Sequence, residues 1–502
     1  MTHPIPIVRG GTLSLLKRTL SQLLTGIFVC LLAAGCSTPQ KHDARIAITH
    51  ANVIDATGSP LQRNMTVIVE GQKIAQIAES AQGALDRETT VIDGSGKFLI
   101  PGLVDSHVHL TGSGEPNGSR QFIVPLLVTH GITTVRDMGG YLESLKPLRD
   151  DIKRGKRLGP EIFFAGPYLD GSPPSFEPSL LVTNVTQAGE DVHNLMQQGV
   201  DFIKVQSILG RDAYFAIAAA AKREKIAFAG HVPDRVTAME ASEAGQKSIE
   251  HLTGVLRACA SDEPRLMREQ IQAPPKGATP SELHAREFAW ERELLATQSE
   301  PKTAKVIATF VRNATWQAPT LILLREDAFP SVQARTATED ALKFVPRSIV
   351  QKWKQAAEEQ DKFASPAEFA LREKLFARSL EVVQQMEKVG VPILAGTDTA
   401  APYVVPGVGL HVELGLLVQA GLSPLQALQA ATKGPAEFLG KSETQGTIER
   451  GKYADLVLLD GNPLDNVGNV GRIRAVFVRG KLLDRQMLDD MLESVERFAG
   501  EN

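Results

Sequence analysis

The sequence predicts an α/β protein, a (β/α)8 TIM barrel with a small composite β-sandwich built from both chain ends. In the middle, at about 101–440, short apolar runs alternate with Ala-rich helical stretches. In the flanks, 45–100 and 441–485, apolar and polar residues alternate between turn signals. The chain has 502 residues, 43% of them hydrophobic, which is enough for a large core. A doubly wound open sheet is the alternative, but no Gly-rich dinucleotide loop follows the first apolar run.

Eight apolar runs are the candidate strands of the barrel. Such runs are typical of parallel strands that are buried on both faces. Two spacers, 252–315 and 324–391, are long, charged and helical in pattern, and we expect them to shape the mouth of the site. Residues 486–502 are expected to form a C-terminal helix or tail. The candidate strands are Leu103–His109, Ile132–Asp137, Glu161–Ala165, Asp201–Gln206, Ile226–His231, Lys247–His251, Trp316–Leu321 and Pro392–Asp398.

The start of the chain predicts export. Cations precede a run of about a dozen apolar residues, Leu23–Ala34, which is too short to span a membrane and is typical of a secretory signal. The run ends in Ala33-Ala34-Gly35-Cys36, which resembles a bacterial lipoprotein signal. We therefore expect residues 1–36 to be a signal peptide, Cys36 to be lipidated, and residues 37–44 to be a tether. The protein would be lipid-anchored to a bacterial membrane, the outer membrane in a Gram-negative source; an uncleaved anchor is the alternative.

Charge and cysteine content exclude other classes. The net charge of −4 and the lack of a basic tract disfavour nucleic-acid binding. Three cysteines are too few for a disulfide framework. A homo-oligomer stays open, and a small-molecule or dipeptide-like compound is the expected partner.

Four of the eleven histidines fall at the carboxyl ends of candidate strands, where barrel enzymes place their chemistry. His107 and His109 are two residues apart in a strand, so both rings can point to one metal ion. His231, His251 and Asp398 end three later strands. Imidazole and carboxylate ligands suit Zn²⁺ and related metals.

Lys204 lies inside the apolar run Asp201–Gln206. A lysine there is costly unless it is paired or neutral. One interpretation is a buried ion pair. The other is a neutral amine that takes up carbon dioxide, forming a carbamate whose two oxygens can bridge two cations.

The order HxH, Lys, His, His, Asp resembles the amidohydrolase superfamily. Phe98–His109 and Gly131–Asp137 are similar to its opening signatures, and residues 446–457 are similar to the segment that closes its β-domain. Gly230–Pro233, Ser248–Leu252 and Ala395–Asp398 resemble the imidazolonepropionase-like branch, which includes metal-dependent prolidases. The resemblance covers about residues 45–485.

The resemblance implies a binuclear centre, with zinc favoured. His107, His109 and Asp398 would hold one ion, His231 and His251 the other, and carboxylated Lys204 would bridge them. Asp398 would also take the proton of the attacking water and pass it to the leaving amine.

Three further residues are candidates for the site. His411 resembles a recurring position after the eighth strand and is expected at the mouth of the active site as a catalytic residue, with helix packing as the alternative. Arg136 and Arg211 are candidate ligands for a substrate carboxylate, with structural ion pairs favoured for both.

We therefore predict a metal-dependent hydrolase that cleaves a carbon–nitrogen bond in an amide, peptide-like or cyclic amide substrate. A mononuclear imidazolonepropionase- or deaminase-type hydrolase with unmodified Lys204 is one alternative. A non-catalytic barrel scaffold is another, disfavoured because all six ligand-type residues are present. Phosphotriester cleavage by the same chemistry also stays open.

Overall fold

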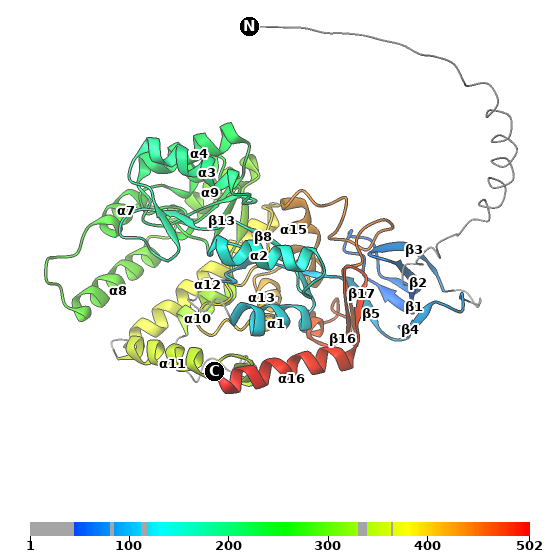
Figure 1. Ribbon diagram of the computed structural model, residues 1–502. Helices are drawn as coiled ribbons and strands as arrows, with labels where there is room; N and C mark the ends of the chain where they lie inside the picture. The colour runs from blue at the N-terminus through cyan, green and yellow to red at the C-terminus, as the bar shows by residue number, and fades with distance from the viewer. Residues whose placement is uncertain (1–44, 81–84, 112–117, 330–338, 363–364) are drawn as a thin grey trace, which may run out of the picture. The chain divides into compact units, whose positions relative to one another are not determined.

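The computed structural model describes residues 45–80, 85–111, 118–329, 339–362 and 365–502 (Figure 1). The expected signal peptide, Cys36 and the tether lie outside these residues. Among the described helices, none is long and apolar enough to cross a membrane.

Strands from both chain ends form one eight-stranded sheet, in the order β17-β16-β15-β5-β1-β2-β3, with β4 paired to β1. The antiparallel pair β5–β15 joins the two ends, with Leu99 opposite Leu458. Both side chains are fully buried in the apolar core of this sheet. The strands are β1 (Arg45–Val53), β2 (Gln62–Glu70), β3 (Lys73–Glu79), β4 (Thr90–Asp93), β5 (Phe98–Pro101), β15 (Leu456–Leu459), β16 (Ile473–Val478) and β17 (Lys481–Leu483).

The middle of the chain forms two parallel sheets. One has the order β6-β7-β8 and the other β10-β9-β11-β12-β13-β14. Every residue of β6 and β7 is buried, as expected for strands covered on both faces. Seven of the eight predicted runs contain a strand of these two sheets. The strands of the two sheets are β6 (Leu103–Val108), β7 (Ile132–Asp137), β8 (Glu161–Phe164), β9 (Tyr168–Asp170), β10 (Ser179–Leu181), β11 (Ile203–Val205), β12 (Phe228–Gly230), β13 (Ser248–Glu250) and β14 (Trp316–Ala318).

Two details differ from the sequence prediction. The run Pro392–Asp398 makes only isolated parallel bridges at its ends, Ile393 with Gln317 and Thr399 with Val108. The backbone amides of this run donate to carbonyl oxygens on different elements and not along one neighbouring strand, so no ladder forms. The amide of Ala395 donates to Ala430 O, whereas that of Asp398 donates to His107 O. The short strands β9 and β10 were not predicted.

Helices follow the strands and fill both long spacers. Several begin with a capping box, in which a Ser or Thr hydroxyl and a Glu or Gln three residues later satisfy each other's backbone amides, as at Thr279–Glu282 and Ser365–Glu368. The helices are α1 (Val124–Thr129), α2 (Leu142–Lys153), α3 (Val185–Gln197), α4 (Arg211–Glu224), α5 (Ala238–Glu243), α6 (Val255–Ala258), α7 (Glu263–Ile271), α8 (Pro280–Ala296), α9 (Glu300–Asn313), α10 (Leu321–Ala328), α11 (Arg347–Asp361), α12 (Pro366–Lys388), α13 (Val408–Gln419), α14 (Pro424–Ala430), α15 (Lys433–Phe438) and α16 (Arg485–Glu501).

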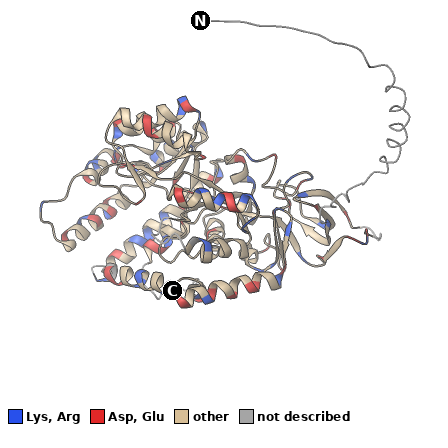
Figure 2. Cartoon of the chain, in the orientation of Figure 1, with Lys and Arg blue, Asp and Glu red and all other residues tan. Residues whose placement is uncertain are grey.

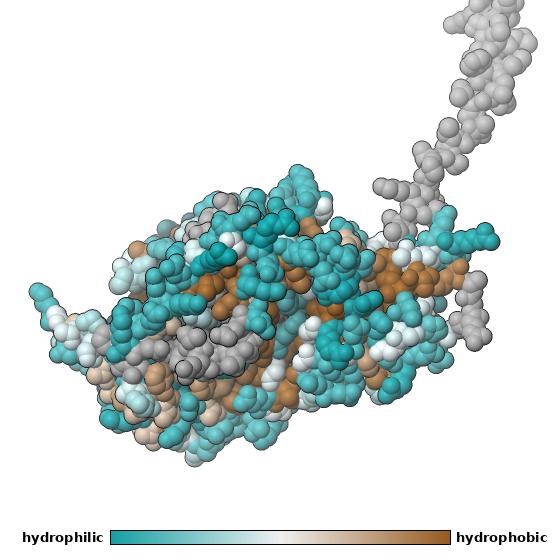
Figure 3. Space-filling model, turned by 90° about the horizontal axis from the view of Figure 1, so that it is seen from below, coloured by the Kyte–Doolittle hydropathy of each residue, from teal (hydrophilic) through white to brown (hydrophobic). Residues whose placement is uncertain are grey.

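The surface mixes both signs of charge. Acidic and basic residues both occur along the helices, and α16 carries mostly acidic residues with an Arg near each end (Figure 2). The face in Figure 3 carries mainly hydrophilic side chains, with apolar patches between them.

Candidate functional site

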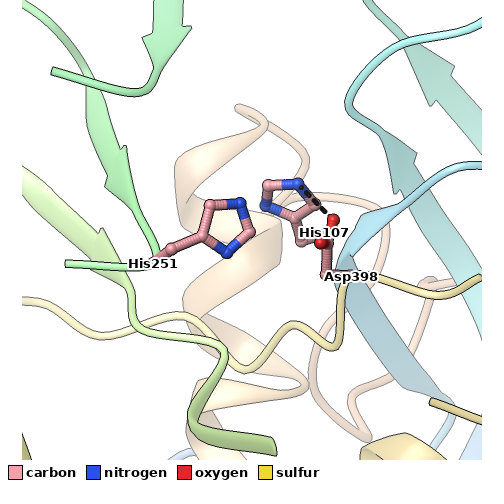
Figure 4. Close-up of side chains that lie close together, drawn as sticks. All are labelled: His107, His251 and Asp398. Atoms are coloured by element: carbon pink, nitrogen blue, oxygen red, sulfur yellow. Dashed lines mark ion pairs between the residues drawn. The ribbon is translucent and has the colours of Figure 1, made fainter. Parts of the chain in front are cut away.

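Residues from three distant parts of the chain meet at the carboxyl ends of the parallel strands. His107, His251 and Asp398 place one ligand atom each within 4.8 Å of one another (Figure 4). Asp398 Oδ1 lies 3.1 Å from His107 Nε2 and 3.0 Å from His109 Nε2. One carboxylate oxygen therefore faces both rings of the HxH pair.

His231 and Lys204 complete the cluster on the other side. The ring of His251 lies 5.0 Å from that of His231 and 4.4 Å from that of His107, measured between centroids. Lys204 is 1% exposed, and a Cβ at residue 230 would lie 2.8 Å from its Cδ. Glycine at this position therefore leaves room for the lysine stem. The structure brings together all six side chains that the sequence singled out as ligands.

Each of the four imidazoles is held through its Nδ1 atom, which leaves Nε2 for the cluster. A partner at Nδ1 fixes the tautomer and the orientation of a histidine that binds metal. The Nδ1 contacts are His107 to Glu250 Oε2 at 2.8 Å, His109 to Gly139 O at 2.9 Å, His231 to Ser207 Oγ at 2.7 Å and His251 to Thr320 Oγ1 at 2.6 Å.

Backbone strain accompanies this arrangement. His251, Thr320 and Asp398 have φ angles of 58°, 45° and 65°, in the left-handed region that non-glycine residues rarely adopt. Such conformations persist where the surroundings hold them, and they are concentrated at functional sites. Here they fall at two ligands and at the residue that orients one of them.

Burial sets the ionisation of the cluster. It lowers the pKa of His251 to about 3, with the neighbouring His107 adding to the effect, so this ring is neutral. Burial also lowers the pKa of Lys204 to about 8, which gives the amine a neutral fraction near physiological pH. Burial alone would raise the pKa of Asp398, but the surrounding His251 and His107 outweigh it and hold the pKa well below the ordinary value. Neutral imidazole and ionised carboxylate are the forms that bind metal.

The cluster fits a divalent metal. Lys204 Nζ is buried and makes no hydrogen bond within the described chain, and the buried atoms His107 Nε2 and Asp398 Oδ1 face each other at ion-pair distance. Buried polar atoms are normally satisfied, so the unpartnered amine beside converging imidazole and carboxylate groups fits a site for a cation. Nitrogen and oxygen donors of this kind suit zinc, manganese or related ions.

Arg136 does not reach a substrate position, which corrects one candidate role. Its guanidinium is 1% exposed and lies below the cluster, where it bonds to Ser106 O, Ser248 Oγ at 2.9 Å and Glu250 Oε2 at 2.8 Å. Arg136 outweighs the effect of burial and holds the pKa of Glu250 below its ordinary value. Arg136 thus neutralises the carboxylate that orients His107.

Arg211 forms the structural ion pair that the sequence analysis favoured, whereas His411 differs from its candidate role. Arg211 forms a two-pronged ion pair with Glu240, so its guanidinium is already engaged. His411 donates a hydrogen bond from Nε2 to His130 O at 2.9 Å, and the centroids of the two rings lie 5.5 Å apart. Because His130 precedes the amino end of β7, His411 packs at the end of the strands opposite the cluster. The expectation of His411 at the active-site mouth is wrong.

Sequence reasoning missed the residues that hold the ligands. Glu250, Ser207 and Thr320 each contact a ligand ring, and Tyr168 OH lies 3.0 Å from His109 Nδ1. The available signal was polar residues beside the ends of predicted strands. Glu250 directly precedes His251, and Thr320 closes the run Trp316–Leu321.

The amidohydrolase family matches residues 98–308 and 336–483 of the chain. The chain belongs to the amidohydrolase family. The chain is a hydrolase that acts on carbon–nitrogen bonds, and the similar proteins agree with the prolidase-like branch that the motifs resemble. Ochratoxinase from Aspergillus niger is 22% identical over 488 aligned positions, which cover 85% of this chain and 83% of that protein.

Two solved structures show a similar fold. Bottromycin amidohydrolase aligns with a TM-score of 0.70 and 22% identity, covering 90% of each chain. A Xaa-Pro dipeptidase with bound methionine aligns with a TM-score of 0.62 and 20% identity, covering 88% of this chain and 100% of the other.

Proposed function

We propose that this amidohydrolase is a metal-dependent enzyme that hydrolyses an amide, peptide-like or cyclic amide bond at a binuclear centre. The observation that carries the proposal is the convergence of four imidazoles, one carboxylate and one buried amine, and among the described residues that amine, Lys204 Nζ, has no hydrogen-bond partner. His107, His109 and Asp398 would hold one ion, and His231 and His251 the other.

We also infer that the eight parallel segments close into a (β/α)8 barrel. Asp201 N donates to Phe164 O at 2.9 Å, which links the region of β11 to β8. The two isolated bridges of segment 391–399 link β14 to β6. In such a barrel, the cluster lies at the carboxyl ends of the strands, where this architecture places its active sites.

The mechanism requires little of the chain besides positioning and one proton transfer. Divalent ions, when bound, would lower the pKa of a water molecule and polarise the substrate carbonyl. Asp398 directs Oδ1 to the two rings of the HxH pair, and it takes the proton from the attacking water. It then delivers that proton to the leaving nitrogen, so that the amine departs neutral.

Lys204 supports a second ion through carboxylation. The amine is buried, has no hydrogen-bond partner within the described chain, and has a pKa lowered to about 8. These are the conditions in which a neutral amine can attack carbon dioxide. Incubation of the zinc-loaded protein with ¹³C-bicarbonate should give one carbamate carbon signal, which Lys204→Met should lack.

A mononuclear hydrolase, such as a deaminase- or imidazolonepropionase-type enzyme, is the second candidate. The observation in its favour is that His107, His251 and Asp398 alone place their ligand atoms within 4.8 Å of one another. Metal analysis separates the two proposals, since two zinc ions per chain support the binuclear centre and one ion supports the alternative.

Turnover tests the proposed reaction. The zinc-loaded protein should hydrolyse members of a panel of N-acyl amino acids, Xaa-Pro dipeptides and cyclic ureides, and a chelator should abolish that activity. Zinc binding without turnover of any panel member would favour the deaminase-type alternative, and failure to bind zinc would favour a scaffold.

We propose that the protein is exported and anchored by a lipid on Cys36, on the basis of the signal-like residues Leu23–Cys36. Expressed in a Gram-negative host, the protein should sediment with membranes, whereas Cys36→Ser should be released. Equal sedimentation of both forms would indicate a retained anchor instead.

A further inference from the structure

A group of exposed apolar side chains lies on segments that contact residues of the cluster. Nine large apolar side chains are exposed among the described residues, and three of them lie on segment 168–181, which contains β9 and β10, and on the loop that follows β11. They are Phe176 at 57% exposure, Leu181 at 38% and Ile208 at 41%, which we call the apolar rim. Single exposed apolar residues are ordinary, but a group of them marks a binding surface.

The two loops that carry the apolar rim are fastened to each other. The buried carboxylate of Asp170 accepts hydrogen bonds from the amides of Gly171 at 2.8 Å, Ser175 at 2.7 Å and Ile208 at 3.0 Å. Leu181 is the strand partner of Asp170 in the β9–β10 pair. The rim is therefore held in place before a ligand arrives, which reduces the entropy lost on binding.

The loops are also in such close contact that only glycine fits at residue 171. A Cβ at Gly171 would lie 2.3 Å from the carbonyl oxygen of Ile208 and 3.2 Å from its Cγ2. The segment that carries Phe176 and Leu181 therefore contacts, at Gly171, the loop that carries Ile208.

The apolar rim is continuous with the ligands of both proposed ions. Phe176 packs against Tyr168 with ring centroids 6.4 Å apart, and Tyr168 packs against His109 at 5.8 Å. On the other side, Ser207 directly precedes Ile208 and contacts His231 Nδ1. A substrate whose scissile bond lies at the cluster can therefore extend a side group onto this rim.

The charge of the rim disfavours an acidic side group. Segments 168–181 and 206–210 contain no Lys or Arg. Their acids are Asp170, which is buried, and Glu177, which accepts the amide of Ser179. The guanidinium of the adjacent Arg211 is bound to Glu240.

We propose that the apolar rim is a substrate subsite that selects amides carrying an aromatic or branched aliphatic side group next to the scissile bond. This inference rests on the proposed function and names the substrate class of the same site. Phe176 and Ile208 are specificity-determining residues, since they offer exposed area to the substrate and no group to the reaction.

The test compares side groups on otherwise identical substrates. The zinc-loaded protein is assayed with the dipeptides Phe-Pro, Leu-Pro, Gly-Pro and Glu-Pro, and with N-acetyl-phenylalanine, N-acetylglycine and N-acetylglutamate. Binding of phenylalanine hydroxamate and glycine hydroxamate, measured by calorimetry, gives a readout that does not need turnover.

We expect the phenylalanine or leucine compounds to exceed the glycine compounds by about tenfold in kcat/KM and in affinity, as partial burial of an apolar side chain predicts. Phe176→Ala and Ile208→Ala should each reduce that ratio by about threefold or more, mainly through KM. Val389→Ala removes a side chain of matched exposure, 56%, at the end of α12 and should leave the ratio unchanged.

Three results would overturn the subsite. Equal or higher activity on glycine or glutamate compounds would refute it while leaving the proposed hydrolase intact. An unchanged ratio in both variants, together with reduced sedimentation with phosphatidylglycerol vesicles, would assign the rim to a membrane surface. Failure to turn over any compound or to bind either hydroxamate would remove the proposed function and the subsite with it.

Discussion

Substitution of Glu250 tests whether the ligand His107 depends on the buried charge beneath it. The Glu250 carboxylate is fully buried and is shared by His107 Nδ1 and Arg136 Nη2, each at 2.8 Å. Glu250→Gln keeps the shape but removes the charge, so the guanidinium of Arg136 is left buried without its counterion. Breaking a buried pair in this way costs about 3–5 kcal/mol.

That cost is a large share of the roughly 5–15 kcal/mol by which a folded protein is stable. Metal affinity should fall as well, since loss of the partner of a ligand histidine typically weakens metal binding about 10- to 100-fold. Urea unfolding of the metal-free protein measures the first effect, and competition with a zinc-chelating dye measures the second.

A double variant separates the two effects. Glu250→Gln with Arg136→Met removes both charges, and replacing a whole buried pair with groups of similar volume is often close to neutral for stability. We expect the double variant to regain most of the stability but none of the zinc affinity. If Glu250→Gln alone changed neither quantity, or if Arg136→Met restored zinc binding, the proposed support of His107 would be refuted.

Three further predictions concern the cluster itself. His109→Ala should abolish turnover and weaken zinc binding while the circular dichroism spectrum is retained; wild-type activity would remove this residue from the site. Asp398→Asn should lower kcat by about 10²–10⁴-fold, the range expected for loss of a positioned proton-transfer group, and a small decrease would assign proton transfer elsewhere. In the metal-free protein, Lys204→Met should raise the free energy of unfolding at pH 7 by up to about 3 kcal/mol, because burial lowers the pKa of Lys204 from 10.5 to about 8. The free-energy penalty of burying the charged Lys204 is fully present below about pH 8. It disappears as the pH rises towards 10.5, because in this range the unfolded chain still holds the proton that the folded chain has lost. If the difference in unfolding free energy between variant and wild type does not shrink between about pH 7 and pH 10.5, the reasoning is contradicted.

The candidate ligands could be predicted because their signals are local. The two-residue repeat of a strand places His107 and His109 on one face, and an unpaired cation in the apolar run around Lys204 is conspicuous. Parallel strands whose carboxyl ends meet at one edge then bring His231 and His251 to the same place.

The partners of those ligands depend on contacts between distant segments. Arg136 lies 114 positions before Glu250, and no pattern in either strand indicates that they meet. For His411, a position after the run Pro392–Asp398 is compatible with both ends of the parallel strands, and only the contact with His130 decides between them. Strands β9 and β10 have three residues each, which is too short to show the two-residue alternation of apolar and polar side chains that identifies a strand.

The pairing of β5 with β15 has a consequence for biosynthesis. Residues 98–101 leave the ribosome more than 350 positions before residues 456–459, their neighbours in the sheet. Until synthesis is almost complete, β5 therefore presents an open hydrogen-bonding edge of apolar residues, a known route to aggregation. Chains that end before β15 should accumulate as insoluble material, even though every proposed metal ligand has already been made.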